Sequence, residues 1–240
     1  MSKFQYHPDI LQRFPDVVGG VILASGMTGG PTPPDLLRLY EAEQQTVKEH
    51  IGNTPLSQIP SLAAWRNAFR RFGVEPTQYR SAAEALLRRL TKKGDIPSIN
   101  LLVDIGNLVS IRYALPVAIM DTRAIRGAIT VRFASGDERY TTLGQQEEDP
   151  PRPGEVIFAD AAGTVFARRW CWRQSEQSAA QADTHAAIIT VEAHHASGHR
   201  DVESALNDLL ELLTTYAGGM FESGILDAER PAIASTYETT

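Results

Sequence analysis

The chain has 240 residues, of which 42% are hydrophobic and 22% charged, with a formal net charge of −6. No apolar run approaches the roughly eighteen residues of a membrane span, and the first residues lack a secretory pattern. The acidic balance argues against a protein that grips long nucleic acid through its phosphates. Cys171 is the only cysteine, so no internal disulfide can form, which fits a cytoplasmic location.

Residues 1–95 are predicted to form a mainly helical portion. A short strand is expected over 17–24 and a Gly- and Pro-rich loop over 25–34, followed by a loose helical pattern over 35–50. A clearer helix is expected over 61–73, with Ser61 as its cap. Another is expected over 81–94, where Ser81 and Glu84 have the spacing of a capping box and Gly94 ends the helix.

Residues 96–219 have a different pattern. Two β-hairpins are predicted, over 124–144 and over 156–173, followed by a strand over 186–194 and an amphipathic helix from residue 201 to Gly218. Residues 220–240 are expected to be a loosely held tail. The prediction is therefore an α+β fold: N-terminal helices, then antiparallel or mixed β-hairpins packed with a C-terminal helix, in one compact unit.

Positive charge is concentrated between Trp65 and Lys93, where eight Lys and Arg residues face only two Glu residues. The candidates for contact with a partner in this segment are Arg66, Arg70, Arg71, Arg88, Arg89, Lys92 and Lys93. Such a local basic surface suits a partner that is touched over a limited area. A solvated helix surface explains the same pattern, and the sequence does not separate the two interpretations.

The segment "RRWCWR", Arg168 to Arg173, is the most unusual in the chain. In a strand, Arg168 would share one side with both tryptophans, and Arg169 would share the other side with Arg173. Aromatic rings beside guanidinium groups make a charged stacking surface that suits nucleotides. A core pair of tryptophans with arginines at its rim is the alternative.

Polar residues also interrupt the apolar segment Ile99–Asp121. Asp104 and Asn107 would share one face of a helix, or could fix neighbouring backbone at the end of a strand. The histidines between His194 and His199 are interpreted as a solvated turn. No metal site and no cofactor are expected.

Several separated residues resemble the editing module of the phenylalanyl-tRNA synthetase beta chain. Val103 and Asp104 are followed by Asn107, Pro116 lies nine positions beyond Asn107, and Asp121 lies five beyond Pro116. The segments "IRGAITVRFASGDERYTTLG" and "GEVIFAD", and Thr184 ahead of the strand to Glu192, continue the match in order. The resemblance covers roughly residues 80–195.

That family removes tyrosine wrongly esterified to the phenylalanine tRNA, with water positioned by backbone groups and the terminal ribose. The resemblance implies a free-standing, cytoplasmic deacylase that hydrolyses the ester of a mischarged tRNA in trans, with the aminoacylated acceptor end of a tRNA as partner. A module that binds tRNA or an amino acid without chemistry is the alternative. The pocket candidates are Asp104, Asn107, Pro116, Ala118, Arg169, Arg173, Gln174, Thr184 and Glu192.

The chain departs from the family at three places in this pocket. Ala118 stands where the synthetase has a His, and Gln174 stands near the Glu that senses the tyrosine hydroxyl. Arg168 and Arg169 replace a pair of glycines. We therefore expect a smaller or more polar substrate than a tyrosyl group, with Arg169 and Arg173 pointing into the pocket and Asp104 bracing the loop that frames it.

Overall fold

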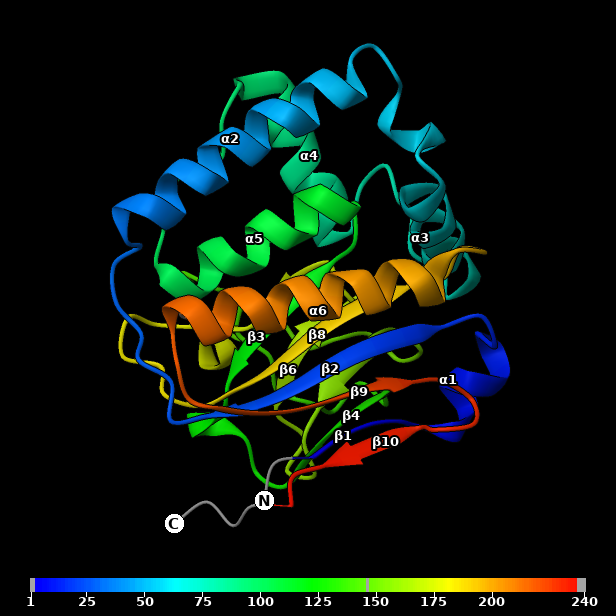
Figure 1. The fold of residues 1–240 in the computed structure, drawn as a ribbon. Helices are drawn as coiled ribbons and strands as arrows, with labels where there is room; N and C mark the ends of the chain where they lie inside the picture. The colour runs from blue at the N-terminus through cyan, green and yellow to red at the C-terminus, as the bar shows by residue number, and fades with distance from the viewer. Residues whose placement is uncertain (1–2, 146, 237–240) are drawn as a thin grey trace.

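The computed structural model describes residues 3–145 and 147–236. The chain folds into three layers, with helices over one face of a four-stranded sheet and a six-stranded sheet against its other face (Figure 1). The α+β class predicted from the sequence is confirmed. Both sheets contain strands from the beginning and the end of the chain, so residues 3–95 do not form a separate helical unit.

The four-stranded sheet is antiparallel throughout. Its order is β3 (Val117–Asp121), β8 (Ala187–Ala193), β2 (Val18–Ser25) and β9 (Met220–Leu226). The strands predicted over 17–24 and 186–194 are therefore present, and they pair with each other in the middle of the sheet. β9 pairs with β2 along its whole length, from Met220 opposite Ser25 to Leu226 opposite Gly19.

The six-stranded sheet is mixed. Its order is β10 (Ala232–Ala234), β1 (Lys3–Tyr6), β4 (Ala128–Phe133), β5 (Val156–Ala159), β6 (Val165–Arg168) and β7 (Arg173–Gln174). Only β1 and β4 run parallel to each other among these neighbours. β7 and β3 are each one of the two outer strands of their sheets, and the functional candidates gather where these two strands lie.

The helices of the described residues are α1 (Pro8–Arg13), α2 (Pro34–Ile51), α3 (Pro60–Arg71), α4 (Ala82–Lys93), α5 (Leu101–Tyr113) and α6 (Gly198–Tyr216), with short 3₁₀ helices at η1 (Leu56–Gln58), η2 (Thr122–Ala124) and η3 (Glu176–Ser178). α4 begins and ends as predicted: the Ser81 hydroxyl accepts a hydrogen bond from the Glu84 backbone N–H, and Gly94 adopts a left-handed conformation. The Glu84 side chain binds Arg66 instead of closing a capping box.

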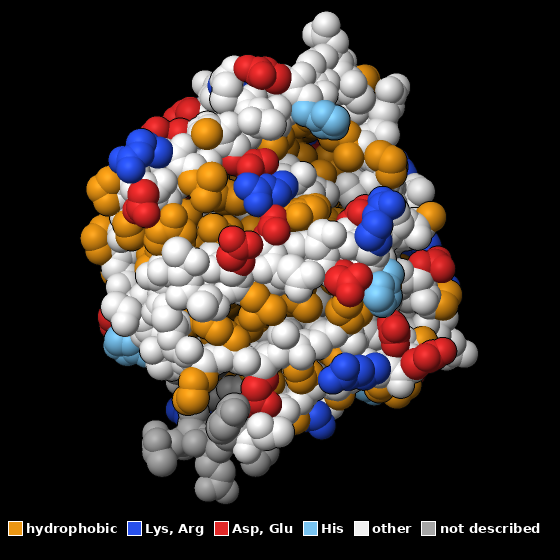
Figure 2. Space-filling model, in the orientation of Figure 1, with side chains coloured by type: hydrophobic (Ala, Val, Ile, Leu, Met, Phe, Trp, Pro, Cys, Tyr) orange, Lys and Arg blue, Asp and Glu red, His pale blue; other side chains and the backbone are white. Residues whose placement is uncertain are grey.

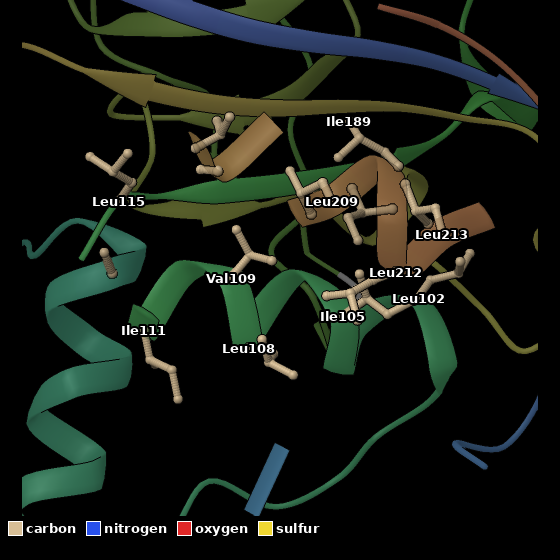
Figure 3. Packing of buried hydrophobic residues seen from close by; sticks show 14 of the residues in the cluster. Leu102, Ile105, Leu108, Val109, Ile111, Leu115, Ile189, Leu209, Leu212 and Leu213 are labelled. Carbon is tan, nitrogen blue, oxygen red and sulfur yellow. The ribbon is translucent and has the colours of Figure 1, made fainter. Parts of the chain in front are cut away.

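The alternation of side chains along β8 builds two hydrophobic cores. Ile189 and Val191 face the helices, where they join a cluster with residues of α5 and α6 that includes Ile105, Leu209 and Leu213 (Figure 3). Ile188 faces the six-stranded sheet and belongs to a second cluster. On this second face, Thr190 and Glu192 are polar and yet buried. Figure 2 shows the molecule in the orientation of Figure 1, and hydrophobic and charged side chains of both signs are interspersed on the visible face.

Three predictions of local structure were wrong, and two elements were not predicted. Residues 124–144 do not form a hairpin: β4 is the only strand there, and its partners are β1 and β5. Residues 220–236 are not loosely held, because β9 and β10 complete the two sheets, whereas 237–240 lie outside the described residues. Ile59 and not Ser61 caps α3, since Pro60 starts the helix. β1 and α1 were not predicted.

Candidate functional site

A cavity of about 190 Å³ opens between the outer strands of the two sheets. Ala118 of β3 and Thr190 of β8 line it from one sheet, and Phe158 and Ala167 line it from the other. Pro116, just before β3, and Gln174 of β7 also line it. Two segments that the resemblance brought together, residues 116–118 and 173–174, therefore line one cavity.

A second cavity of about 280 Å³ adjoins the first, since Val117, Leu143 and Gln174 line both. Asn107 of α5 lines this second cavity, together with Asn100 at the start of the helix. Between the two, the Gln174 Nε2 donates a hydrogen bond to the Ile119 carbonyl oxygen at 2.9 Å. The amide of Gln174 thereby joins the edges of the two sheets, a bond that a carboxylate could not donate.

Glu192 is the most unusual group in the first cavity. The residue lines the cavity although it is only 2% exposed. Oε1 accepts hydrogen bonds from the Tyr6 hydroxyl at 2.5 Å and from the Trp170 Nε1 at 3.1 Å. Burial raises the pKa of the Glu192 carboxyl to about 7, although both hydrogen bonds act in the opposite direction.

Gly19 makes the approach of Tyr6 possible. Gly19 on β2 lies directly opposite Glu192 on β8 in the register of the sheet. A Cβ atom at position 19 would lie 2.2 Å from the Tyr6 hydroxyl oxygen. A residue with a side chain there would push the hydroxyl away from the carboxylate, so Gly19, Tyr6 and Glu192 form one arrangement built from three strands.

The strand geometry expected for "RRWCWR" is wrong. β6 ends at Arg168, and Arg169 and Trp170 have φ angles of 45° and 61°, so the backbone turns instead of alternating. Arg168 is 1% exposed and pairs with Glu155 and with Asp149 at 3.0 and 2.6 Å. Its charge is therefore neutralised away from both cavities.

Arg169 does not line either cavity. Its guanidinium carbon lies 3.9 Å from the centre of the Tyr79 ring and 4.5 Å from that of Trp172. It also lies within 3.4 Å of Glu155. The expectation that Arg169 points into the pocket is wrong, whereas Arg173 does line the first cavity. The left-handed turn directs the Arg169 side chain onto the aromatic rings of Tyr79 and Trp172.

Arg173 and Trp172 form the exposed end of the first cavity. Both residues line it, and the Arg173 guanidinium carbon lies 4.8 Å from the Trp172 ring centre. Trp170 is fully buried, with edge-to-face contacts to Trp65 and Phe14. The two interpretations of this segment therefore apply to different tryptophans: Trp170 belongs to the core, and Trp172 belongs to a surface with arginines on it.

Asp104 and Thr184 lie outside the cavity linings. Asp104 is fully buried in the first turn of α5, where it accepts hydrogen bonds from the Thr32 and Ser98 hydroxyls and from the Ile99 backbone N–H. Thr184 donates to the Asp121 carboxylate at 2.5 Å. Both contacts fix chain segments next to the cavities, and a role of either residue in activity stays a prediction.

The basic segment is spread over α3 and α4, and its members differ. Arg66 is not free, because it makes a bidentate pair with the buried Glu84. Arg71 lies over the Phe14 ring, at 4.7 Å from the ring centre. The remaining candidates are exposed; they are Arg70, Arg88, Arg89, Lys92 and Lys93. Ala82, the first residue of α4, lines the first cavity. The exposed cations of α4 lie farther along the helix.

The histidine segment is not simply a solvated turn. The His194 ring packs edge-to-face on Trp65 and Trp170, at 4.5 and 4.7 Å between ring centres, and burial lowers its pKa to about 3. His195 pairs with Asp201 at 2.8 Å. Within residues 3–145 and 147–236, no group of His, Cys, Asp and Glu could hold a metal ion, and no helix is long and apolar enough to cross a membrane.

A larger cavity of about 540 Å³ lies among the helices, lined by residues of α2, η1 and the end of α5. Arg112 lines it, but Glu43 and Asp208 neutralise this cation at 2.5 and 2.7 Å. None of the pocket residues expected from the sequence lies there. We therefore place the candidate site in the smaller cavities between the sheets, where Asn107, Pro116, Ala118, Arg173, Gln174 and Glu192 are found.

A family model matches the part of the chain that contains the candidate site. A model of the B3/4 domain family matches residues 64–218. The chain belongs to the B3/4 domain family. The phenylalanine–tRNA ligase beta subunit of Shewanella oneidensis is 29% identical over 94 residues, which are 39% of this chain and 12% of that protein. The resemblance to the synthetase beta chain inferred from the sequence is therefore confirmed.

A solved structure is also similar. The crystal structure of an N-terminal fragment of the phenylalanyl-tRNA synthetase beta subunit from Pyrococcus horikoshii covers 92% of this chain, at 14% sequence identity and a TM-score of 0.47, and the match takes up 50% of that fragment. This chain thus spans 12% of the Shewanella subunit and half of the Pyrococcus fragment.

Tyr6, Trp170 and Thr190 contribute to the site, and sequence reasoning did not propose them. Tyr6 lies on β1, which was not predicted, and 186 residues separate it from the carboxylate that it binds. Trp170 was considered only as part of a stacking surface or of a core pair with Trp172. Thr190 is two positions from Glu192 on the same face of β8, so strand periodicity alone could have found it.

Proposed function

We propose that this B3/4 protein is an aminoacyl-tRNA deacylase that hydrolyses the ester of a mischarged tRNA in trans. The observation that carries the proposal is the cavity between β3 and β7, the outer strands that lie next to each other. Pro116, Ala118 and Gln174, which stand at positions compared with the family, line this cavity. Its volume of about 190 Å³ is smaller than the roughly 300–1,000 Å³ of pockets for drug-sized ligands. That size suits a single amino-acid moiety and supports the expectation of a small or polar substrate.

The lining supports a reaction that uses positioned water without a side-chain nucleophile. Burial raises the pKa of the Cys171 thiol well above its usual value, and Glu192 adds to this effect, so the thiol stays protonated. Ala118 offers no general base. Water would add to the ester carbonyl, and the terminal ribose hydroxyl would leave. An aminoacyl ester is labile, so orientation and backbone N–H donors near the carbonyl suffice for acceleration.

The outer end of the cavity supports a nucleotide partner. Trp172 presents an aromatic ring and Arg173 a cation, a combination on which a base can stack while a phosphate is bound. Arg88 and Arg89 lie six and seven positions after Ala82 on α4, which is about 10 Å along a helix axis. An acceptor stem entering at the cavity would pass near these cations.

A binding module without chemistry is the second candidate. It is favoured by Ala118 at the position of the family His and by Gln174, whose amide N–H is already used in the bond to Ile119. Such a protein would hold an amino acid or an aminoacyl nucleotide in the same cavity. The two candidates differ only in whether the bound ester is cleaved.

The deciding experiment is a deacylation panel, in which purified protein is incubated with tRNAs charged with each amino acid, including non-protein ones. We expect hydrolysis of one or a few of the esters above the spontaneous rate. Ala118→Leu fills the cavity and should abolish this hydrolysis, whereas Ala42→Leu on the exposed face of α2 should not. No hydrolysis of any ester, together with measurable amino-acid binding, would favour the binding module.

Binding of the tRNA body has a separate test in its salt dependence. Changing Arg70, Arg88 and Arg89 together to Gln should weaken binding and flatten the salt slope, since each lost phosphate contact removes a released counterion. Arg66 stays unchanged because it pairs with Glu84. The matched control changes three exposed arginines elsewhere, Arg126, Arg139 and Arg200, to Gln. Equal slopes for both triple variants would show that the basic segment is only a solvated surface.

A further inference from the structure

The outer edge of β9 is the longest strand edge without a paired strand in the part of the chain that the structure describes. β9 has seven residues and pairs with β2, whereas the outer strands β10 and β7 of the other sheet have three and two. β3, at the opposite border of the same sheet, has five residues and a bridge from Met120 to Ala179. β9 lies beside β2 at the border of its sheet (Figure 1). Its outward N–H and C=O groups therefore remain for another strand.

Both faces of β9 pack within the molecule. Phe221 and Ile225 pack against the hydrophobic cluster that contains residues of α6. On the opposite face, a Cβ atom at Gly224 would lie 3.4 Å from Ile233 Cδ1 of β10. The strand is thus held in place on both sides, and Ser223 at its centre is exposed. A partner would therefore meet a preformed edge.

The sequence of β9, "MFESGIL", lacks the usual features that keep an edge strand from pairing. Such features include Lys or Pro on the strand and a bulge. β9 contains neither residue, and its pairing with β2 runs from end to end without a register shift. Met220 at its start is 54% exposed. Glu222 is the one charged residue of the strand, so it restricts which partner and which register are favourable.

β9 is complementary to a second copy of itself in one antiparallel register, with Ser223 opposite Ser223. That register pairs all seven residues of the strand. Around its centre, apolar side chains lie opposite apolar side chains: Met220 opposite Leu226, and Phe221 opposite Ile225. Opposed apolar pairs of this kind stabilise an antiparallel ladder.

The charges favour the same register. Glu222 would lie opposite Gly224 of the second copy, and strand alternation puts both on one face of the sheet. On that face, a Cβ atom at Gly224 would lie 3.3 Å from Arg230 Nη2. The carboxylate of each copy would therefore come next to a guanidinium group of the other. A register centred on Glu222 would instead oppose two carboxylates, which is unfavourable.

We propose that β9 pairs with β9 of a second copy, so that two four-stranded sheets form one continuous antiparallel sheet across a twofold axis at Ser223. The same strand edge is used by both copies, so the assembly closes at a dimer. β3, which lines the first cavity, is the opposite outer strand of the sheet. The dimer is therefore independent of the proposed function.

Sedimentation velocity of the full chain over a range of concentrations measures the pairing. Because one strand edge from each copy makes a small interface, we expect a dissociation constant on the order of 10 μM. A protein that is still monomeric at a concentration about thirty-fold above this value would overturn the proposal.

Two substitutions at the twofold axis test the second copy and the register together. Residue 223 would lie opposite itself, so Ser223→Glu and Ser223→Lys each oppose two like charges. Each variant alone should dimerise about 10-fold more weakly or worse. An equimolar mixture of the two should dimerise again, because Glu then lies opposite Lys. Recovery in the mixture also shows that both variants are folded.

The matched controls are Ser57→Glu and Ser57→Lys, at an exposed position in η1. They make the same changes in net charge and should leave the dissociation constant of the dimer unchanged. Equal weakening by the Ser57 and Ser223 variants would show that net charge and not the β9 edge is responsible. A dimer that neither Ser223 variant weakens, or variants that do not recover when mixed, would show that β9 does not pair with itself about Ser223.

Discussion

Asp104 and Glu192 are both buried carboxylates, 0% and 2% exposed, yet they are satisfied in opposite ways. Asp104 uses both of its oxygens on donors from two nearby loops, including the Ile99 backbone N–H and the Thr32 hydroxyl. Glu192 accepts both of its side-chain hydrogen bonds on one oxygen, from residues of two other segments, and the residue lines a cavity. Burial alone therefore does not distinguish the two carboxylates. Their hydrogen-bond partners and the cavity beside Glu192 do.

The surroundings explain why the two groups differ. Asp104 lies in the first turn of α5, where the unpaired backbone N–H groups and the helix dipole favour a negative charge. Glu192 lies on a strand between two sheets, among aromatic rings that include Trp65 and Trp170. Two side-chain hydrogen bonds only partly offset the loss of water there, and so its pKa rises to about 7.

The largest expected effect is on the pH dependence of stability at Glu192. The folded protein holds this proton more tightly than the unfolded chain, whose pKa is near 4.5, so stability falls as pH rises from about 4.5 to about 7. Glu192→Gln keeps the shape and removes the charge. It should have nearly the stability of the unmodified protein at pH 4 and exceed it by about 3 kcal/mol at pH 8.

Urea unfolding at both pH values measures this difference. The control is Glu211→Gln, whose side chain is exposed and whose effect should be small at either pH. A stability difference for Glu192→Gln that is the same at pH 4 and pH 8 would mean that burial does not raise the pKa of the Glu192 carboxyl.

A smaller effect is expected at Asp104, and of the opposite sign. Asp104→Ala leaves the Ile99 N–H and two hydroxyls without an acceptor, which should lower the free energy of unfolding by about 1–3 kcal/mol at neutral pH. Deacylation should fall together with stability, because the loop next to the second cavity loses its anchor. Full stability with lost turnover would instead place Asp104 in contact with the substrate.

Local signals account for what the sequence predicted well. α4 needed only Ser81 and Gly94 at its ends and an apolar stripe, and β8 needed only a run of apolar residues. Residues 124–144 had a plausible turn at Ser135–Asp137, but the partners of β4 come from residues 3–6 and 156–159. Strand pairing over such separations is decided by the tertiary fold, which no short segment encodes.

The candidate site shows the same division. Family spacing placed Asn107, Pro116 and Gln174 around shared cavities, and the structure brings them there. Strand periodicity failed at Arg169, because a left-handed turn follows β6 and alternation does not continue through it. The role of Tyr6 could not be predicted, since nothing near residue 6 in the sequence indicates that its hydroxyl donates a hydrogen bond to Glu192.

The smallest expected effect concerns that hydroxyl. Tyr6→Phe removes one donor from Glu192 Oε1 and leaves the ring in the core. A hydrogen bond to an ionised carboxylate is worth roughly 1.5–3 kcal/mol and one to a neutral group about 1 kcal/mol, so the variant should be destabilised by about 1 kcal/mol more at pH 8 than at pH 4. Urea unfolding at the two pH values measures the difference.

Gly19→Ala tests the same bond from another atom. Its new Cβ would lie 2.2 Å from the Tyr6 oxygen in the present geometry, so the hydroxyl must move away while the Tyr6 side chain stays intact. The pKa of Glu192 should rise in both variants, because each loses a hydrogen bond that lowers it. Carbon-13 NMR of the side-chain carboxyl groups follows this titration. If the pKa stayed near 7 in both, the Tyr6 bond would not govern Glu192, and Trp170 alone would hold the carboxylate at the cavity.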